Sequence, residues 1–407
     1  MKNFEIPDFY RSPIISKVKA KRKLEDPRKK DFSPSVLDFG TVRFFIARHF
    51  GFCYGVENAI EISYKAIAEN PEKRIFLLSQ MIHNPDVNED LMSHGIRFIQ
   101  DTDGSQLISW EELDSDDIVI IPAFGTTVEI ENILREIGVN VSKYNTTCPF
   151  VEKVWNRSER LGKDDHTVII HGKRNHEETR ATFSRSLQNA PTIILKDIQE
   201  AEILGEFILG KRKISDFPAV FEGKYSHNFQ PERDLIKIGV VNQTTMLAHE
   251  TEEISDYLRG IMVQKFGDEA IKNHLADTRD TLCYATNDNQ TATLGLLEKE
   301  ADLAIVIGGY NSSNTTHLVE LLEKKFKTFF ITSANEIHSE KEINSFDIHA
   351  EKIVGLTDFL PSNRPISIIL TSGASCPDSI VDGVIQRILD LVKPSLSAEK
   401  ALHNFLR

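Results

Sequence analysis

A short apolar run followed by a polar turn and a helical pattern recurs along the whole chain. The apolar runs occupy residues 42–47, 74–78, 116–121, 166–170, 235–241, 304–307 and 366–370. The helical patterns occupy residues 56–68, 128–137, 150–161, 250–264, 289–299 and 379–392. Strands that alternate with helices form mainly parallel sheets, because each crossover helix returns the chain to the same edge. We therefore expect an α/β fold, with functional side chains near the carboxyl ends of the strands.

The chain has 407 residues, a length typical of two or three domains. We expect an N-terminal extension at residues 1–42, three α/β domains, and a C-terminal helix and tail at residues 379–407. The three domains are placed at residues 43–147, 148–281 and 282–378. Residues 201–235 are mixed in character and are interpreted as an insertion. Apolar side chains should dock the extension on the body, and these are Phe4, Phe9, Tyr10, Ile14 and Ile15.

Charge and cysteine usage exclude several classes of protein. The chain has 48 Lys and Arg against 61 Asp and Glu, a formal net charge of −13, which argues against nucleic acid as a partner. Four widely spaced cysteines do not make a secreted disulfide framework, so a reducing compartment is expected. No apolar run is long enough for a transmembrane helix, so no membrane partner is expected. The first 40 residues resemble neither a transit nor a signal peptide, which favours the cytoplasm over the plastid stroma.

Three of the four cysteines share one local pattern. Cys53 lies at a strand-to-helix turn between Gly51 and Gly55, and both Cys148 and Cys283 also precede helical patterns. Nearby backbone amides at such a turn should lower the thiol pKa and favour the thiolate. Three thiolates from three α/β units would leave one iron of a cubane iron–sulfur cluster open for a substrate. The alternative is that the cysteines are small buried residues, because free cysteine is among the most buried types.

Polar clusters follow several of the expected strands. His83 and Asn84 lie just past one strand, as either a ligand site or a turn cap. Residues 171–179 form the densest polar cluster, without the second histidine of an HExxH zinc site. Glu178 in that cluster suits either proton transfer or complementation of a helix dipole. Gly308 and Gly309, followed by hydroxyl and amide residues that open a helix, suit an oxyanion such as phosphate.

Eight motifs together resemble a known family. In chain order they are GFCYGV, HNPDVN, NTTCPFVEKVW, HGKRNHEET, NQTTML, DTLCYAT, GGYNSSNTTHL and TSGASCPD, between about residues 43 and 390. They resemble the 4-hydroxy-3-methylbut-2-enyl diphosphate reductases, which act last in the non-mevalonate isoprenoid pathway. The chain is most similar to the long form of cyanobacteria and plastids, which also carries an N-terminal extension.

The resemblance implies a fold of three α/β domains around a central [4Fe-4S] cluster. It implies that Cys53, Cys148 and Cys283 are the three cluster ligands and that one iron stays open. The substrate's allylic hydroxyl would bind this iron and leave as water after the transfer of two electrons and protons. The products would be isopentenyl diphosphate and dimethylallyl diphosphate, with ferredoxin or flavodoxin as the one-electron donor.

The family's other functional residues also have counterparts here. Glu178 matches the proton-relay glutamate, and Thr244 matches the threonine beside the substrate hydroxyl. The positions that match diphosphate ligands are His83, His176, Ser312, Ser313, Asn314 and Ser375. The chain departs from the short bacterial form at Phe124, where that form has a histidine and the long form shares the phenylalanine, so one diphosphate contact is absent or replaced. It departs from the family at Cys376, where a small non-cysteine residue is usual, and we interpret Cys376 as a packed thiol.

Two other functions remain open at the level of sequence. An aconitase-like hydro-lyase would also use three cysteines and an open iron, but without net electron transfer. A non-enzymatic iron–sulfur or zinc sensor is the second alternative, although zinc usually takes a fourth nitrogen or sulfur ligand.

Overall fold

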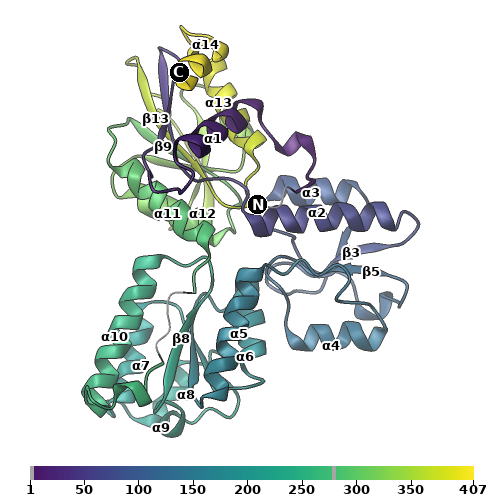
Figure 1. Cartoon of the computed structure of the whole chain (residues 1–407), viewed down its shortest axis with the longest axis vertical. Coiled ribbons are helices and arrows are strands. Elements are labelled where there is room, and N and C mark those ends of the chain that lie inside the picture. The colour runs from purple at the N-terminus through teal and green to yellow at the C-terminus, as the bar shows by residue number, and fades with distance from the viewer. Residues whose placement is uncertain (1–3, 277–280) are drawn as a thin grey trace. The chain divides into compact units, whose positions relative to one another are not determined.

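The structure is a computed structural model, and it describes residues 4–276 and 281–407. Strands and helices alternate along the chain as expected (Figure 1). The chain divides into two compact units. Unit 1 consists of Met1–Glu61, Ile82–Glu89 and Tyr284–Arg407, and unit 2 consists of Ile62–Met81 and Asp90–Cys283. Asp280 of the DTLCYAT motif lies outside the described residues.

Unit 1 is built on a five-stranded sheet with the order β1-β2-β13-β9-β10. The strands are β1 (Ser35–Asp38), β2 (Val42–Ile46), β13 (Ile366–Ser372), β9 (Leu303–Ile307) and β10 (Thr328–Ile331). Only β1 runs antiparallel to its neighbour among these strands. A separate antiparallel pair joins β11 (Ile343–Asp347) and β12 (Lys352–Leu356). The helices of this unit are α1 (Pro13–Glu25), α11 (Tyr284–Leu297), α12 (Ser313–Glu323), α13 (Asp378–Val392) and α14 (Ala398–Leu406).

β2, the first strand of the domain expected at residues 43–147, lies in a sheet of unit 1 with strands from the C-terminal part of the chain. β2 pairs in parallel with β13, with Val42 opposite Ile366 and Ile46 opposite Leu370. Both strands are rich in β-branched and aromatic residues, and their apolar side chains join one core cluster. The first strand of the expected N-terminal domain therefore belongs to the sheet of the C-terminal residues.

Unit 2 contains two three-stranded parallel sheets. One has the order β4-β3-β5, formed by Arg97–Phe98, Ile75–Leu77 and Ile118–Ile120. The other has the order β7-β6-β8, formed by Thr192–Leu195, Thr167–His171 and Ile238–Asn242. The helices are α4 (Val128–Ile137), α5 (Pro149–Lys163), α6 (Glu177–Ser186), α7 (Ile198–Ile208), α8 (Phe217–Val220), α9 (Pro231–Asp234) and α10 (Ala248–Phe266). Two further helices, α2 (Tyr54–Glu69) and α3 (Pro85–Ser93), have residues in both units.

Residues 201–235, interpreted from the sequence as an insertion, pack their aromatic side chains into a core of unit 2. Phe207, Phe217 and Phe221 are almost fully buried, with the ring centroids of Phe207 and Phe217 5.1 Å apart. Phe217 also stacks on Phe229 at 5.4 Å. Aromatic pairs at these separations stabilise the segment beyond the effect of area burial.

The N-terminal residues dock largely as expected. Phe4, Tyr10 and Ile15 are buried, but Phe9 is 56% exposed, so it does not anchor the extension. The extension also supplies β1, which pairs with β2, so it is part of the sheet. In the described residues no helix is both long enough and apolar enough to cross a lipid bilayer.

Candidate active site

Cys53, Cys148 and Cys283 each stand immediately before a helix. α2 begins at Tyr54, α5 at Pro149 and α11 at Tyr284. The backbone N–H groups of the three cysteines donate to Ala374 O (3.2 Å), Ala123 O (2.9 Å) and Thr244 O (3.2 Å), respectively. These three side chains are half-buried, whereas Cys376 is completely buried in the core of unit 1. The shared position explains why their sequence patterns are alike.

Cys148 does not have the lowered thiol pKa that the turn pattern suggested. Burial raises the pKa of its thiol to about 11, and the charges of Cys283 and Glu178 act in the same direction. The backbone N–H groups of Phe150 and Val151 at the start of α5 oppose this shift. A thiolate at this position therefore needs a cation beside it, as a coordinated metal would provide.

Glu178 and Thr244 form a closely bonded pair in unit 2. Thr244 N donates to Glu178 Oε1 at 2.6 Å, and Thr244 Oγ1 donates to Glu178 Oε2 at 2.9 Å. Glu178 is 1% exposed. Burial raises its pKa to about 7, although both bonds from Thr244 favour the carboxylate and limit the rise. The carboxyl group can therefore change its protonation state near neutral pH.

His176 connects Glu178 to Phe124. The Nδ1 of His176 accepts from Glu178 N at 3.2 Å and caps the start of α6. The ring of Phe124 meets the imidazole edge-on, with centroids 5.5 Å apart. Phe124 therefore packs against a second candidate residue.

Glu177 faces a different neighbour from Glu178. It accepts a short hydrogen bond from Ser79 Oγ and lines a cavity of about 130 Å³ that also contacts Arg180. Burial raises the pKa of Glu177 to about 7, as it does for Glu178. Adjacent helical residues point in different directions, so two carboxyl groups with similar pKa values have separate surroundings.

The sequence reasoning missed the role of Gln243. Its Oε1 accepts from Lys173 N and from Thr179 Oγ1, both at 3.0 Å. Its Nε2 donates to Thr245 Oγ1 at 2.8 Å. Gln243 thus joins the loop after β6 to the loop after β8 and fixes Thr244 opposite Glu178. Gln243 lies in the NQTTML motif, just past the end of β8 and next to Thr244, and this position could have identified it from the sequence.

Asn242 and Thr281 were also missed. Asn242 N donates to Thr281 Oγ1 at 2.7 Å, and Thr281 Oγ1 lies 3.0 Å from Asn242 Oδ1. This pair attaches the residues before Cys283 to the end of β8. Together with the bond from Cys283 N to Thr244 O, it positions Cys283 beside the Glu178–Thr244 pair.

A second polar region lies in unit 1, where three loops meet. Ser375 Oγ donates to His83 O at 3.0 Å. A Cβ placed on Gly309 would lie 2.3 Å from the same carbonyl oxygen, so only glycine allows this approach. Burial lowers the pKa of His83 to about 4, so its imidazole is neutral at physiological pH.

The start of α12 supplies most of the remaining candidates. Ser312 caps the helix by accepting from Thr315 N at 3.3 Å, and Ser313 is buried next to it. Asn314 Oδ1 accepts from Ala374 N at 3.1 Å. The buried Nδ2 of Asn314 has no hydrogen-bond partner among the described residues. A buried donor at a helix start is suited to an anionic ligand.

The candidate residues fall into two groups. Unit 1 holds Cys53, His83, Ser312, Ser313, Asn314 and Ser375, and unit 2 holds Cys148, His176, Glu178, Thr244 and Cys283. Within residues 4–276 and 281–407, no three His, Cys, Asp or Glu side chains are grouped as metal ligands.

Comparisons with known proteins give the family of the chain. A family model described as LytB protein matches residues 44–389. The 4-hydroxy-3-methylbut-2-enyl diphosphate reductase of Synechococcus sp. strain WH7803 is 40% identical over 356 residues, which cover 87% of each chain. The enzyme of the same name from Prochlorococcus marinus strain AS9601 is 38% identical and covers 94% of this chain and 96% of its own.

Two solved structures are also similar. The structure of an (E)-4-hydroxy-3-methyl-but-2-enyl diphosphate reductase, described as the terminal enzyme of the non-mevalonate pathway, has a TM-score of 0.51 at 25% identity and covers 85% of this chain and 99% of its own. The E-1-hydroxy-2-methyl-but-2-enyl-4-diphosphate reductase from Plasmodium falciparum has a TM-score of 0.61 at 20% identity and covers 86% and 88%, which supports the fold. The family match extends over most of the sequence and contains every candidate residue described above. On these grounds, the chain belongs to the LytB protein family.

Proposed function

We propose that the chain catalyses the reductive removal of the allylic hydroxyl from 4-hydroxy-3-methylbut-2-enyl diphosphate. The products are isopentenyl diphosphate and dimethylallyl diphosphate, and the reaction is the last step of the non-mevalonate pathway. The names of the relatives support this activity. Within this chain, the Glu178–Thr244 pair is the observation that supports this activity most directly. The hydroxyl can leave as water only if it receives a proton, and electrons alone do not supply one.

Cys53, Cys148 and Cys283 are the proposed ligands of a [4Fe-4S] cluster. Their common position before helix starts suits an anionic group, because the N-terminal end of a helix dipole stabilises negative charge. The raised pKa of Cys148 fits a thiol that loses its proton only to a metal. When bound, the cluster would supply electrons. It would also supply one iron that has no protein ligand and can bind the substrate's oxygen.

Glu178 is the proposed proton donor. A carboxyl group with a pKa of about 7 keeps a substantial protonated fraction at neutral pH and can give its proton up during the reaction. Thr244 Oγ1, 2.9 Å from Glu178 Oε2, can pass this proton to the leaving oxygen or hold the substrate hydroxyl in place. His176 fixes the backbone of Glu178.

The diphosphate is proposed to bind to neutral donors. These are the side chains of His83, His176, Ser312, Ser313, Asn314 and Ser375. Five of them are buried and lie at strand ends or helix starts, and the Nδ2 of Asn314 has no partner among the described residues. Backbone and side-chain dipoles can hold a diphosphate without arginine when they converge on it.

Reduced ferredoxin or flavodoxin is the proposed electron donor, and the cytoplasm is the proposed compartment. Both proteins deliver single electrons, which suits a cluster that changes oxidation state one electron at a time. The cyanobacterial relatives support the cytoplasmic placement.

The test is anaerobic turnover of the allylic diphosphate by cluster-reconstituted protein with a reduced one-electron dye. We expect two equivalents of dye to be oxidised per isoprenoid diphosphate formed. Substrate consumption without dye oxidation would instead indicate a hydro-lyase. No consumption at full iron and sulfide content would reject the proposed activity.

A further inference from the structure

Residues 4–33, here called the N-terminal segment, run along the loop that carries Cys53. Three ring contacts join the segment to this loop, which spans residues 48–54. Phe4 meets Tyr54 with centroids 5.0 Å apart, Tyr10 meets Phe52 at 5.7 Å, and Phe32 meets His49 at 5.6 Å. Both partners of each pair belong to unit 1.

Lys19 of α1 makes the central polar contact. Its Nζ lies 2.6 Å from Asp378 Oδ1 and 4.4 Å from the centroid of the Phe50 ring. The ion pair lies against the backbone of Gly51, since a Cβ on that residue would be 2.8 Å from Asp378 Oδ1 and 2.9 Å from Lys19 Nζ. Gly51 has φ +78°, a conformation that favours glycine. The contact thus holds the turn two residues before Cys53.

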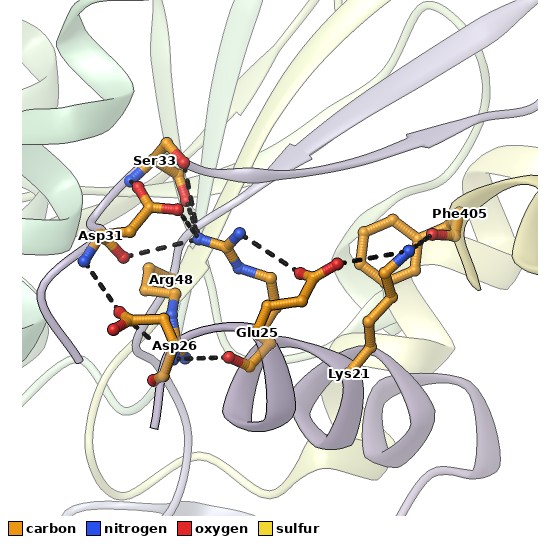
Figure 2. Close-up of polar contacts among 8 residues, drawn as sticks. Lys21, Glu25, Asp26, Asp31, Ser33, Arg48 and Phe405 are labelled. Carbon is orange, nitrogen blue, oxygen red and sulfur yellow. Dashed lines mark hydrogen bonds and ion pairs between the residues drawn. The ribbon is translucent and has the colours of Figure 1, made fainter. Parts of the chain in front are cut away.

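Arg48 joins the start of the loop to the end of α1 (Figure 2). Its side chain is 6% exposed and donates from Nη2 to Arg22 O at 3.1 Å and to Asp26 O at 3.3 Å. A cation at the carboxyl end of a helix is stabilised by the exposed carbonyl groups there.

The residues after α1 are held by the guanidinium of Arg22. Arg22 Nη2 donates to Asp31 Oδ2 and to Ser33 O, both at 2.9 Å. Asp31 N in turn donates to Asp26 Oδ2 at 2.8 Å. These bonds hold residues 31–33 against the end of α1, where Arg48 also binds. The segment therefore contacts the loop both through α1 and through the residues after it.

The segment also reaches the residues after Cys283. Lys29 Nζ lies 3.0 Å from Asp288 Oδ2 and 5.4 Å from the ring of Tyr284. The hydroxyl of Tyr284 accepts from Tyr54 N at 3.0 Å. A single segment therefore contacts the residues that follow two of the proposed cluster ligands.

We propose that the N-terminal segment positions the Cys53 loop for cluster binding, with Lys19 as its central positioning residue. The inference rests on the proposed function, because it assumes that Cys53 is a ligand. A loop that contains a glycine such as Gly51 has many backbone conformations when it is unsupported. Contacts outside the ligand set restrict such a loop and thereby keep the thiolate at the metal.

The test compares Lys19→Met with Lys19→Arg and with a matched control, Lys163→Met. Methionine keeps the length of the side chain and a high helix propensity but removes the cation. Arginine restores the charge. Lys163 is likewise a helical lysine in an ion pair, with Glu159 Oε1 at 2.5 Å, but that pair lies within α5 of unit 2.

Three measurements on the reconstituted protein decide the outcome. Amide hydrogen exchange in residues 48–54 should be about fivefold faster in Lys19→Met, a typical effect of losing one half-buried ion pair. In Lys19→Met the cluster should also be lost about fivefold faster in air, and the electron paramagnetic resonance spectrum should change. Lys19→Arg and Lys163→Met should behave like the wild type in all these measurements. Unchanged exchange and spectrum would overturn the inference, as would equal acceleration throughout unit 1.

Failure of the inference and failure of the proposed function can be told apart. If Cys53→Ser retains full iron and sulfide, Cys53 is not a ligand and the proposed ligand set is wrong. If Cys53→Ser loses the cluster while Lys19→Met changes none of the three measurements, the ligand set stands and the positioning role is rejected.

Discussion

At the scale of single residues, two neighbouring glutamates have the same raised pKa for the same cause but different surroundings. Glu178 is bonded twice by Thr244, whose carbonyl accepts from Cys283 N. Glu177 is bonded by Ser79 and lines a separate cavity. Burial alone does not distinguish the two, so the choice of proton donor depends on their partners.

We predict that Glu178→Gln lowers turnover by at least about a hundredfold, the usual size of a lost general acid. Cluster content and substrate binding should be unchanged, because Gln has nearly the same shape. Glu177→Gln is the matched control, with the same change at a residue of similar burial. Both variants are to be measured with one reduced donor at equal iron content. A larger loss of turnover in the Glu177 variant would show that Glu177, and not Glu178, donates the proton.

The pH dependence of turnover should report the same residue. The acid must be protonated to act, and burial raises the pKa of Glu178 to about 7, so turnover should fall as the pH rises above 7. Glu177→Gln should keep this decline, although the pKa of Glu177 is also about 7. A profile that becomes flat in the Glu177 variant would show that Glu177 is the titrating group.

The Nδ2 group of Asn314, which has no hydrogen-bond partner among the described residues, gives a prediction for binding. Asn314→Asp keeps the oxygen that accepts from Ala374 N but replaces the buried Nδ2 donor with a charged acceptor. A lost hydrogen bond to a charged group costs about 1.5–3 kcal/mol, so the substrate dissociation constant should rise at least about tenfold. Isothermal titration calorimetry measures this constant, with Asn335→Asp, an exposed residue of the same unit, as the control. An unchanged constant would place the anion elsewhere.

At the scale of elements, three helices begin immediately after the proposed ligands. We predict that Cys53→Ser, Cys148→Ser and Cys283→Ser each lose most of the iron and sulfide after anaerobic reconstitution. Cys376→Ser should retain both, because Cys376 is completely buried in the core of unit 1. Iron and sulfide are counted per chain in all four variants. Full retention in any of the first three, together with loss at Cys376, would contradict the ligand set.

The close approach of two loops at Gly309 predicts a stability change. Gly309→Ala should destabilise unit 1 by about 1–3 kcal/mol, because its Cβ would overlap the carbonyl oxygen of His83. Gly260→Ala in α10 has open space around the new methyl group and should stabilise by about 0.5–1 kcal/mol. Thermal unfolding of the two variants should therefore shift in opposite directions. A shift in the same direction would mean that the loop at Gly309 relaxes freely.

Most elements were predictable because their apolar patterns are local. The helix expected at residues 128–137 is α4, and its start is capped by Thr127. The core role of residues 201–235 was not predictable, since Phe207, Phe217, Phe221 and Phe229 have no regular period and meet only in the fold. The pKa of Cys148 was misjudged for a similar reason: amides at the turn were visible in the sequence, but burial was not.

At the scale of the whole molecule, the order of strands could not be read from the sequence. β2 and β13 lie at opposite ends of the chain and still pair along their full shared length. Hydrophobic patterns show that both are buried strands, but they contain no information on the partner. The polar candidates were found from motifs, whereas the bonds that hold them, such as those of Gln243, required the structure.

The pairing of β2 with β13 has a consequence for biosynthesis. A ribosome adds about 5–20 residues per second, so β2 and the Cys53 loop emerge on the order of tens of seconds before β13 does. By the end of this interval the strands of both sheets of unit 2 have been made, whereas β2 has only β1 beside it and still lacks β13. Cys53 therefore reaches its final environment late in translation, after Cys148 and Cys283 have emerged. Nascent chains of this protein should need chaperone protection at β2, and iron–sulfur assembly factors should act on them only after β13 is made.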